Sequence, residues 1–214
     1  MQARSLPDVP ELAEAASDDA ARSDPQHAHR LRLVGAMAAV LAEKAYSTVT
    51  IADVARQARV SKRTFYEHFA DKEACFIAVY ATLSDIVLKA TFDATAGNLP
   101  WATKLRASTR AYLSTLESQP ALTRTLMMDI YAAGPEALKI RRQVQKRFAD
   151  QLRRLVALSR KDGPKKTRLS QAMATAVIGG INELVLVAVE EGRADRLTEL
   201  ATTADALLQG VLGS

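Results

Sequence analysis

The sequence predicts an all-α protein of about nine helices. Apolar residues recur every three or four positions along most of the chain, which is the period of a helix buried on one face. The 9 Gly and 7 Pro mostly fall between these periodic segments, and no segment alternates as a half-buried strand does. Aromatic residues make up only 5% of the 214 residues, so the core must consist mainly of aliphatic side chains.

Composition and charge divide the chain into three regions. Residues 1–26 carry two Arg and six acids and are interrupted by proline, so we expect a disordered acidic tail there. Residues 27–73 carry eight Lys or Arg against five acids and are expected to form one domain. Residues 74–214 carry nineteen against thirteen and are expected to form a second, helical domain.

The single cysteine, Cys75, excludes an internal disulfide framework and a cysteine-based zinc site within one chain. This suits a reducing cytoplasm, where we expect the protein to work. We expect no membrane span, because no run of about 18 uncharged apolar residues occurs. The first residues also lack the basic patch and apolar core of a secretory signal.

The first two helices are expected before residue 60. Apolar residues at helical spacing predict one helix over about 29–46. Thr50 and Asp53 then form a Thr-x-x-Asp start, in which the acid lies in the first turn where the helix dipole favours it. The short helix that follows is expected to end near Ala58.

A short turn separates this helix from the next one, over 61–68, for which Ser61 is the expected cap. Asp71 is placed to cap a longer helix that runs to about 95. Pro135 is expected at a first helical position, and Gly192 at a helix end. Beyond a break at 96–100, five more helices are expected at 101–117, 120–132, 135–160, 167–191 and 194–212.

A short helix, a tight turn and a second short helix rich in polar and basic groups form a helix-turn-helix arrangement. The stretch TVTIADVARQARVSKRTFYEHFADKEACF resembles the DNA-binding domain of TetR-type transcriptional regulators. The resemblance rests on the helix start at Thr48 and Thr50, on Thr64-Phe65-Tyr66 and on His68-Phe69. It covers about 45 residues, while the rest of the chain resembles this family only in being helical and of the right length.

The resemblance implies a homodimer that binds a palindromic operator in double-stranded DNA through helix 61–68. It also implies a small-molecule effector bound in the C-terminal domain, most often releasing a repressor, and it implies no cofactor and no enzymatic activity. Arg63 is the expected guanine contact, with Lys62 beside it on the recognition helix. The full set of expected DNA-binding residues is Thr48, Thr50, Arg59, Lys62, Arg63, Thr64, Tyr66, His68 and Lys72.

One position departs from the family pattern. Arg59 stands in the turn between the two short helices, where the family usually has glycine. Either the turn takes a right-handed conformation here, or the strain of a positive φ is accepted. The guanidinium then either contacts a phosphate or is simply solvated.

Two other interpretations compete with DNA binding. His68 could act as a catalytic base, but the sequence offers no nucleophile and acid to complete such a set. His27 and His29 could hold a metal ion, although histidines at a domain edge are usually solvated. The acidic tail 1–26 could compete with DNA for the basic surface, or serve as a passive linker.

The C-terminal half is expected to provide the dimer interface. Residues 172–192 are apolar nearly all round, too much so for the surface of a monomer. We expect helices 167–191 and 194–212 to pair with their two-fold mates as a four-helix bundle. The interface residues expected are Ala172, Ala176, Gly179, Gly180 and Val187.

The residues of the effector pocket are the hardest to predict from the sequence. Asn182 and Glu183 interrupt the apolar run, so they either cross the dimer interface or line a pocket. The other expected ligand-binding residues are Trp101, Tyr112, Met127, Met128 and Tyr131, for each of which core packing is the alternative. Residues 139–168 hold twelve Lys or Arg and two acids, which indicates a solvated face, a field that attracts an acidic ligand, or a second contact to nucleic acid.

Overall fold

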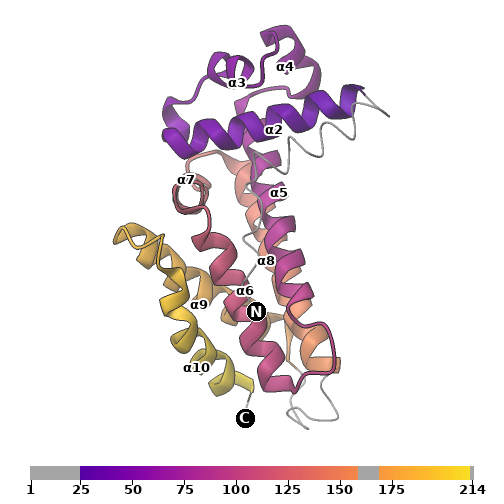
Figure 1. Cartoon of the computed structure of the whole chain (residues 1–214), viewed down its shortest axis with the longest axis vertical. Helices are drawn as coiled ribbons and strands as arrows, with labels where there is room; N and C mark the ends of the chain where they lie inside the picture. Colours follow the sequence, from indigo (N-terminus) through magenta and orange to yellow (C-terminus); the bar gives the residue numbers. More distant parts are fainter. Residues whose placement is uncertain (1–24, 159–168, 213–214) are drawn as a thin grey trace. The chain divides into compact units, whose positions relative to one another are not determined.

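The structure is a computed structural model and describes residues 25–158 and 169–212. Within these ranges it contains only α-helices and two short 3-10 helices, which confirms the predicted all-α class (Figure 1). The predicted tail, apart from its last two residues, lies outside the described residues. The α-helices are α2 (Pro25–Glu43), α3 (Ile51–Gln57), α4 (Lys62–His68), α5 (Lys72–Asp93), α6 (Trp101–Glu117), α7 (Pro120–Asp129), α8 (Pro135–Leu158), α9 (Gln171–Glu190) and α10 (Ala201–Leu212), and the 3-10 helices are η1 (Tyr46–Thr48) and η2 (Leu197–Leu200).

The chain folds into two compact units. The first comprises residues up to Leu83 together with Ala121–Ile140, and the second comprises Ser84–Pro120 and the chain from Arg141 onward. The division falls inside α5 and α8, so each of these helices contributes to both units. It differs from the expected division into 27–73 and 74–214, which concerns function and stays a prediction.

The first unit is built around α2, which packs against α3 and α4. Leu33 and Met37 of α2 are fully buried, as the helical spacing predicts, and they share the core with Phe65 of α4. Burying each such side chain contributes about 1.5–3 kcal/mol. This packing fixes the angle at which α4 presents its outer face.

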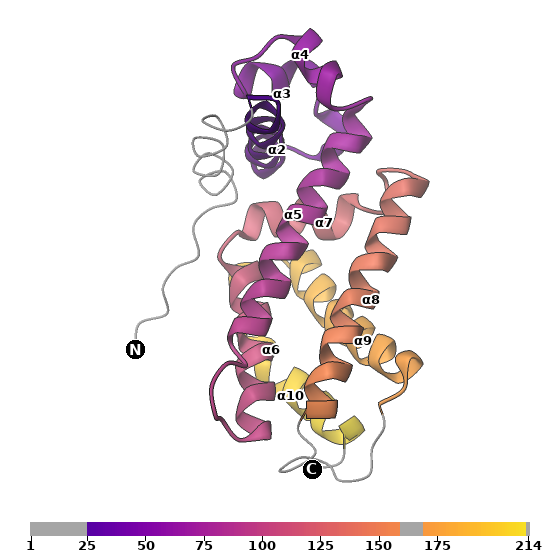
Figure 2. The same cartoon turned by 90° about the vertical axis from the view of Figure 1, so that its right-hand side faces the viewer.

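The second unit has its own aliphatic core. Trp101 and Leu105 of α6 pack with Leu152 of α8, Val177 of α9 and Leu208 of α10. Helix α10 contacts both α6 and α9, and Figure 2 shows these helices from the side. Four segments of helix therefore surround a common interior, in which the cavity described below lies.

Several helix ends differ from the expected ones, and two differences are the largest. Helix α2 begins at Pro25, four residues early, because proline is tolerated at a first helical position. The expected last helix, 194–212, is instead a turn, the 3-10 helix η2 and the shorter α10. Gly192 ends α9 as predicted, with φ +76°.

Candidate nucleic-acid interface and ligand cavity

Helix α3 begins with the predicted cap. The Thr50 hydroxyl accepts a hydrogen bond of 3.2 Å from the Asp53 N–H, and the Asp53 carboxylate accepts one of 3.0 Å from the Thr50 N–H. The carboxylate also binds the Lys44 ammonium at 2.6 Å and the Arg56 guanidinium at 2.8 Å. Hydrogen bonds from Lys44 and then Thr50 hold the pKa of Asp53 well below its usual range. Asp53 therefore stays ionised and ties α3 to the end of α2.

The turn after α3 contains Arg59, for which the sequence left a right-handed and a left-handed conformation open. Arg59 has φ +54°, the sole positive φ of a residue other than glycine in 25–158 and 169–212. Its N–H bonds to the Arg56 carbonyl at 3.1 Å, and the Val60 N–H bonds to the Ala55 carbonyl at 3.0 Å. This pattern is the Schellman motif, whose left-handed position favours glycine. The left-handed alternative is therefore the one adopted.

The same motif ends α9, where glycine fills the left-handed position. The Gly192 N–H bonds to the Val189 carbonyl at 3.1 Å, and the Arg193 N–H bonds to the Ala188 carbonyl at 2.8 Å. The two turns thus share one geometry and differ in the residue that adopts it. A left-handed conformation costs an L-residue about 1–2 kcal/mol relative to the right-handed one.

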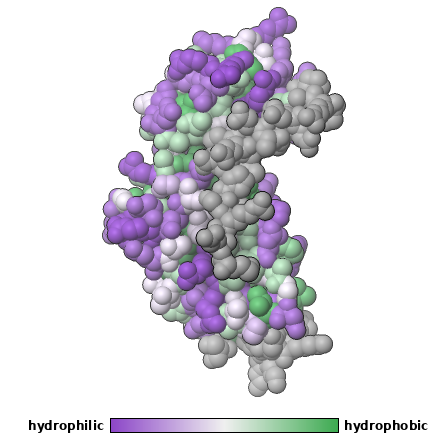
Figure 3. Space-filling model, in the orientation of Figure 1, coloured by the Kyte–Doolittle hydropathy of each residue, from purple (hydrophilic) through white to green (hydrophobic). Residues whose placement is uncertain are grey.

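Helix α4 presents a polar, basic outer face. Ser61 caps it by accepting a 3.0 Å hydrogen bond from the Thr64 N–H, and the hydroxyls of these two residues lie 3.0 Å apart. Lys62, Arg63 and Tyr66 are exposed. The surface over α3 and α4 is largely hydrophilic in Figure 3. The ammonium, guanidinium and phenol donors of this face are exposed, so no other described helix of the same unit covers them.

Arg63 has one partner that DNA would have to replace. Its side chain is 90% exposed and its Nε lies 3.3 Å from the Glu67 carboxylate, one helical turn away. Exposed pairs of this kind contribute only about 0.3–0.5 kcal/mol. The guanidinium is therefore nearly free to leave Glu67 for a guanine base.

His68 lies at the end of α4, half-buried against α2. Its ring centre is 6.0 Å from that of His29, and its carbonyl accepts a 3.3 Å hydrogen bond from Arg30. Partial burial, and then the neighbouring His29, lower the pKa of His68. The neutral ring is the favoured form at pH 7, so any contact to phosphate would use an N–H donor rather than a charge.

The remaining predicted DNA contacts are less uniform. Thr48 is exposed and donates to the Ala45 carbonyl at 2.9 Å. The Lys72 ammonium donates to the carbonyls of Tyr46 and Val49 at 2.9 and 3.0 Å, and lies 4.3 Å from the centre of the Tyr46 ring. It is thus occupied within its own unit, which leaves the backbone N–H of Lys72 as the donor expected to face a phosphate.

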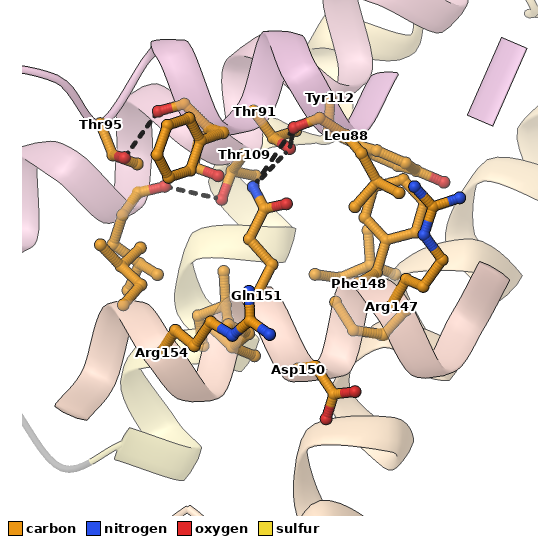
Figure 4. Close-up of a pocket in the computed structure, with 18 of the residues that line it drawn as sticks. Leu88, Thr91, Thr95, Thr109, Tyr112, Arg147, Phe148, Asp150, Gln151 and Arg154 are labelled. Carbon is orange, nitrogen blue, oxygen red and sulfur yellow. Dashed lines mark hydrogen bonds between the residues drawn. The ribbon is translucent and has the colours of Figure 1, made fainter. Parts of the chain in front are cut away.

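The second unit encloses a cavity of about 360 Å³ (Figure 4). Phe92 and Leu158 line it while remaining 67% and 83% exposed, so the cavity opens to solvent beside them. Its volume lies at the lower end of the range for small-molecule sites, about 300–1,000 Å³. The lining residues, from α5, α6, α8, α9 and α10, are Leu88, Thr91, Phe92, Thr95, Leu105, Ser108, Thr109, Tyr112, Arg147, Phe148, Asp150, Gln151, Leu152, Arg154, Leu155, Leu158, Ile178, Ile181, Asn182 and Leu208.

Two predicted ligand residues meet in this cavity. The Tyr112 hydroxyl donates a 2.6 Å hydrogen bond to the Asn182 side chain, which links α6 to α9. The Tyr112 ring also packs edge-on against Phe148 of α8, with centres 5.7 Å apart. Asn182 therefore lines the cavity of its own unit, which is one of the two positions predicted for it.

The other five predicted ligand residues lie elsewhere. Trp101 is buried in the core and borders a smaller hollow beside the cavity. Glu183 is exposed on α9 and does not line the cavity. Met127, Met128 and Tyr131 belong to the first unit, at and just after α7, where the last two are exposed.

Sequence reasoning missed the contribution of α8. Phe148, Gln151 and Leu155 line the cavity at helical spacing, and Gln151 donates to the Thr91 hydroxyl at 2.8 Å and to the Leu88 carbonyl at 3.4 Å (Figure 4). The signal was present, because α8 carries an apolar stripe on an otherwise basic helix. The high charge of residues 139–168 instead favoured the interpretation of this segment as a solvated face.

The residues predicted for the dimer interface form one face of α9. Ala172, Ala176 and Val187 are exposed, although their helix is strongly apolar. No atom lies within 4 Å of a β-carbon built on Gly179, whereas one on Gly180 would lie 3.2 Å from Leu207 of α10. Gly180 thus serves the packing of α9 on α10 within the chain, and the other four remain available to a partner.

Two general features of the described residues bear on other sites. No group of three or more His, Cys, Asp or Glu side chains there is placed to hold a metal ion. Helices α5 and α9 are long and apolar enough to cross a membrane by composition, a test that core helices of other proteins also pass. Only a third of the apolar window in α9 is buried within the chain.

Residues 33–79 match the family model described as bacterial regulatory proteins of the tetR family. No curated protein matches the sequence. Among solved structures, FadR of Bacillus subtilis in complex with stearoyl-CoA is 19% identical with a TM-score of 0.72, covering 86% of this chain and 97% of that one. FadR of Bacillus halodurans is 19% identical (TM-score 0.73; 87% and 95% covered). Salmonella enterica GusR is 18% identical (TM-score 0.71; 90% and 98% covered).

Proposed function

We propose that the protein is a transcriptional regulator of the TetR family, and that it is a repressor released from its operator by a small molecule. The repressor is a homodimer that works in the cytoplasm and binds a palindromic operator with two copies of α4. Each copy enters one of two successive major grooves. The effector occupies the cavity of the second unit.

The observation that carries this proposal is the outer face of α4. A short, capped helix held by a buried aromatic core exposes Lys62, Arg63 and Tyr66 together. Arg63 is the candidate for a bidentate contact to guanine, and Lys62 for a phosphate. Thr48 at the end of η1 and Thr50 at the cap of α3 are both exposed and supply hydroxyls for further phosphate contacts.

The dimer is supported by the uncovered face of α9. Ala172, Ala176 and Gly179 are small and leave room for the close approach of a second helix. Met173 and Val187 add apolar surface that is 47% and 40% exposed. Contiguous apolar surface of this kind usually marks an interaction site in a soluble protein.

Release by the effector requires that the ligand favour one of two conformations of the chain. Helix α5 is suited to report the ligand, because the same helix lines the cavity with Leu88 and Thr91 and begins with Lys72, which is bonded to η1. FadR of Bacillus subtilis, which has a similar fold, was solved in complex with stearoyl-CoA, and this supports a small-molecule ligand for the present chain as well. A bound molecule that shifts α5 would change how the two recognition helices are spaced.

The test is a binding titration with the DNA upstream of the gene that encodes the protein. We expect a specific complex at low salt whose affinity falls steeply as salt rises. Arg63→Ala should weaken the specific complex by about 1–3 kcal/mol, while Arg142→Ala, which removes an exposed arginine outside α4, should leave its affinity unchanged. If no specific complex forms with or without cell extract, the proposed function is refuted.

A further inference from the structure

The cavity of the second unit has an apolar body. Its apolar lining includes Leu88, Phe92, Phe148, Leu155 and Ile178. Its volume of about 360 Å³ equals the liquid volume of about twelve water molecules. A hydrocarbon body of about ten carbon atoms is therefore of a size that the cavity can hold.

The polar groups inside the cavity are few and mostly paired. Gln151 is fixed by its hydrogen bonds to Thr91 and Leu88, which leaves its carbonyl oxygen without a partner among residues 25–158 and 169–212. Tyr112 and Asn182 bind each other at 2.6 Å. These groups can orient a ligand but carry no charge, so the charge selectivity of the site depends on the rim.

The charged residues that line the cavity, Arg147, Asp150 and Arg154, form its rim. The negative charge of Asp150 does not cancel the positive charge of this rim. Asp150 is bound by the Lys146 ammonium at 2.8 Å and by Arg153 at 3.5 Å, and the Lys146 hydrogen bond lowers its pKa. Arg147 is paired with Asp85 at 2.6 Å. Arg154 also lines the cavity, and within the described chain it forms no ion pair.

We infer that the cavity binds a compact amphipathic carboxylate, with a hydrocarbon body of about ten carbons and its carboxylate on Arg154. A guanidinium holds a carboxylate through two parallel hydrogen bonds, which an ammonium cannot do. Residues 141–158 carry six Lys or Arg and one Asp, and this field raises the local concentration of anions. The inference rests on the proposed function for its biological meaning, but the binding itself can be measured without DNA.

The test is isothermal titration of the full chain with four ligands of equal chain length below their micelle concentrations. These are decanoate, decanol, decylamine and decanoyl-CoA. We expect decanoate to bind at least about tenfold more tightly than decanol, a factor equal to about 1.4 kcal/mol, and decylamine to bind most weakly. Equal affinity for decanoate and decanol would overturn the inference. Tight binding of decanoyl-CoA without binding of decanoate would also overturn it, because the phosphates of the thioester would then be the recognised anion.

Substitution at the rim tests the residue. Arg154→Gln should weaken decanoate about tenfold and leave decanol unchanged, since only the charged contact is lost. Arg142→Gln removes the same charge from an exposed position of α8 outside the cavity and should change neither affinity. An unchanged decanoate affinity in Arg154→Gln refutes the assigned contact. If decanoate binds but leaves the operator complex intact, the proposed release of the repressor is wrong. The inferred ligand class would not be contradicted by that result.

Discussion

The Asp129 carboxylate, at the end of α7, accepts a 2.8 Å hydrogen bond from the backbone N–H of Tyr46, 83 residues earlier in the chain. Tyr46 opens η1, the segment that leads into α3. A second bond runs in parallel, from the Thr125 hydroxyl to the Leu41 carbonyl at 3.0 Å. Helix α7 therefore holds the segment that positions the helix-turn-helix, within the first unit.

Removing the carboxylate should destabilise the first unit. In Asp129→Ala the partly buried N–H of Tyr46 loses its acceptor, which costs about 1–3 kcal/mol. Asp129→Asn retains a carbonyl oxygen at the same position and should lose less than half of that amount. Urea unfolding followed by circular dichroism checks both variants. If alanine and asparagine are equally harmless, the bond contributes nothing to stability.

Replacing Arg59 by glycine should stabilise the protein by about 1 kcal/mol, because glycine adopts a positive φ without the steric cost that arginine bears. Arg59→Ala is the matched control, since it removes the guanidinium and keeps the strain. A stability gain in Arg59→Gly but not in Arg59→Ala isolates the backbone effect. Should Arg59 also contact a phosphate, both variants will reduce the salt slope of operator binding by about one.

The sequence supports the helices and the recognition face far better than the details around them. The periodicity of Leu33, Met37 and Phe65 is local, so helical spacing predicts their burial. The positive φ of Arg59 comes with two hydrogen bonds between backbone groups, which do not depend on the side chain. The sequence therefore did not decide between the left-handed and the right-handed conformation of the turn. The occupied ammonium of Lys72 was not predictable either, because its acceptors lie 23 and 26 residues away in the chain.

The cavity shows a different limit. The cavity is lined by five helices. Helical periodicity predicts which face of each helix is apolar, but it does not predict where the packing of these faces leaves a cavity. Asn182 could be proposed because it interrupts an apolar run, and Tyr112 because an aromatic ring can stack on a ligand. Met127 and Tyr131 were proposed on side-chain chemistry alone, and only the fold shows that they belong to the other unit.

Lys62 and Arg63 should differ in what they contribute to DNA binding. Lys62→Ala should weaken binding to all sequences and lower the salt slope by about one, as for the loss of a phosphate contact. Arg63→Ala should cost about 1–3 kcal/mol on the operator and relax selectivity at one base pair in each half-site. Fluorescence anisotropy on operator and random duplexes at several salt concentrations separates the two. A loss of selectivity in Lys62→Ala with none in Arg63→Ala would reverse these assignments.

Cys75 provides a pH-dependent probe of the first unit. Burial raises the pKa of this thiol to about 12, whereas in the unfolded chain it is about 8.5. The folded state therefore holds the proton more tightly, so the stabilisation is complete below the unfolded pKa and is lost as pH rises toward 12. Between pH 8 and 10 this loss should reach about 2 kcal/mol.

The comparison that isolates the thiol is Cys75→Ala, which should show a flatter decline in unfolding free energy over the same pH interval. Tyr46, whose pKa burial also raises to about 12, titrates in both proteins, and because Cys75 is the smallest cause of that shift, most of the Tyr46 contribution cancels from the difference. Parallel pH profiles would mean that the thiol is accessible in the folded state. Rapid labelling of native Cys75 at pH 8 would agree with that result and contradict its burial.

The dimer interface predicts the strongest effect of a single substitution. Val187→Arg places a charge on the apolar face of α9, and a charge buried without a partner there should prevent two copies from pairing. Leu99→Arg is the matched control, because Leu99 is exposed to the same extent, 40%, and lies in the loop before α6. We expect Val187→Arg to sediment as a monomer at micromolar concentration and to lose at least about a hundredfold in operator affinity, since a single half-site remains in contact. A dimer that persists in Val187→Arg would move the interface away from this face of α9, and a wild-type monomer would remove the two-fold arrangement on which operator recognition is proposed to depend.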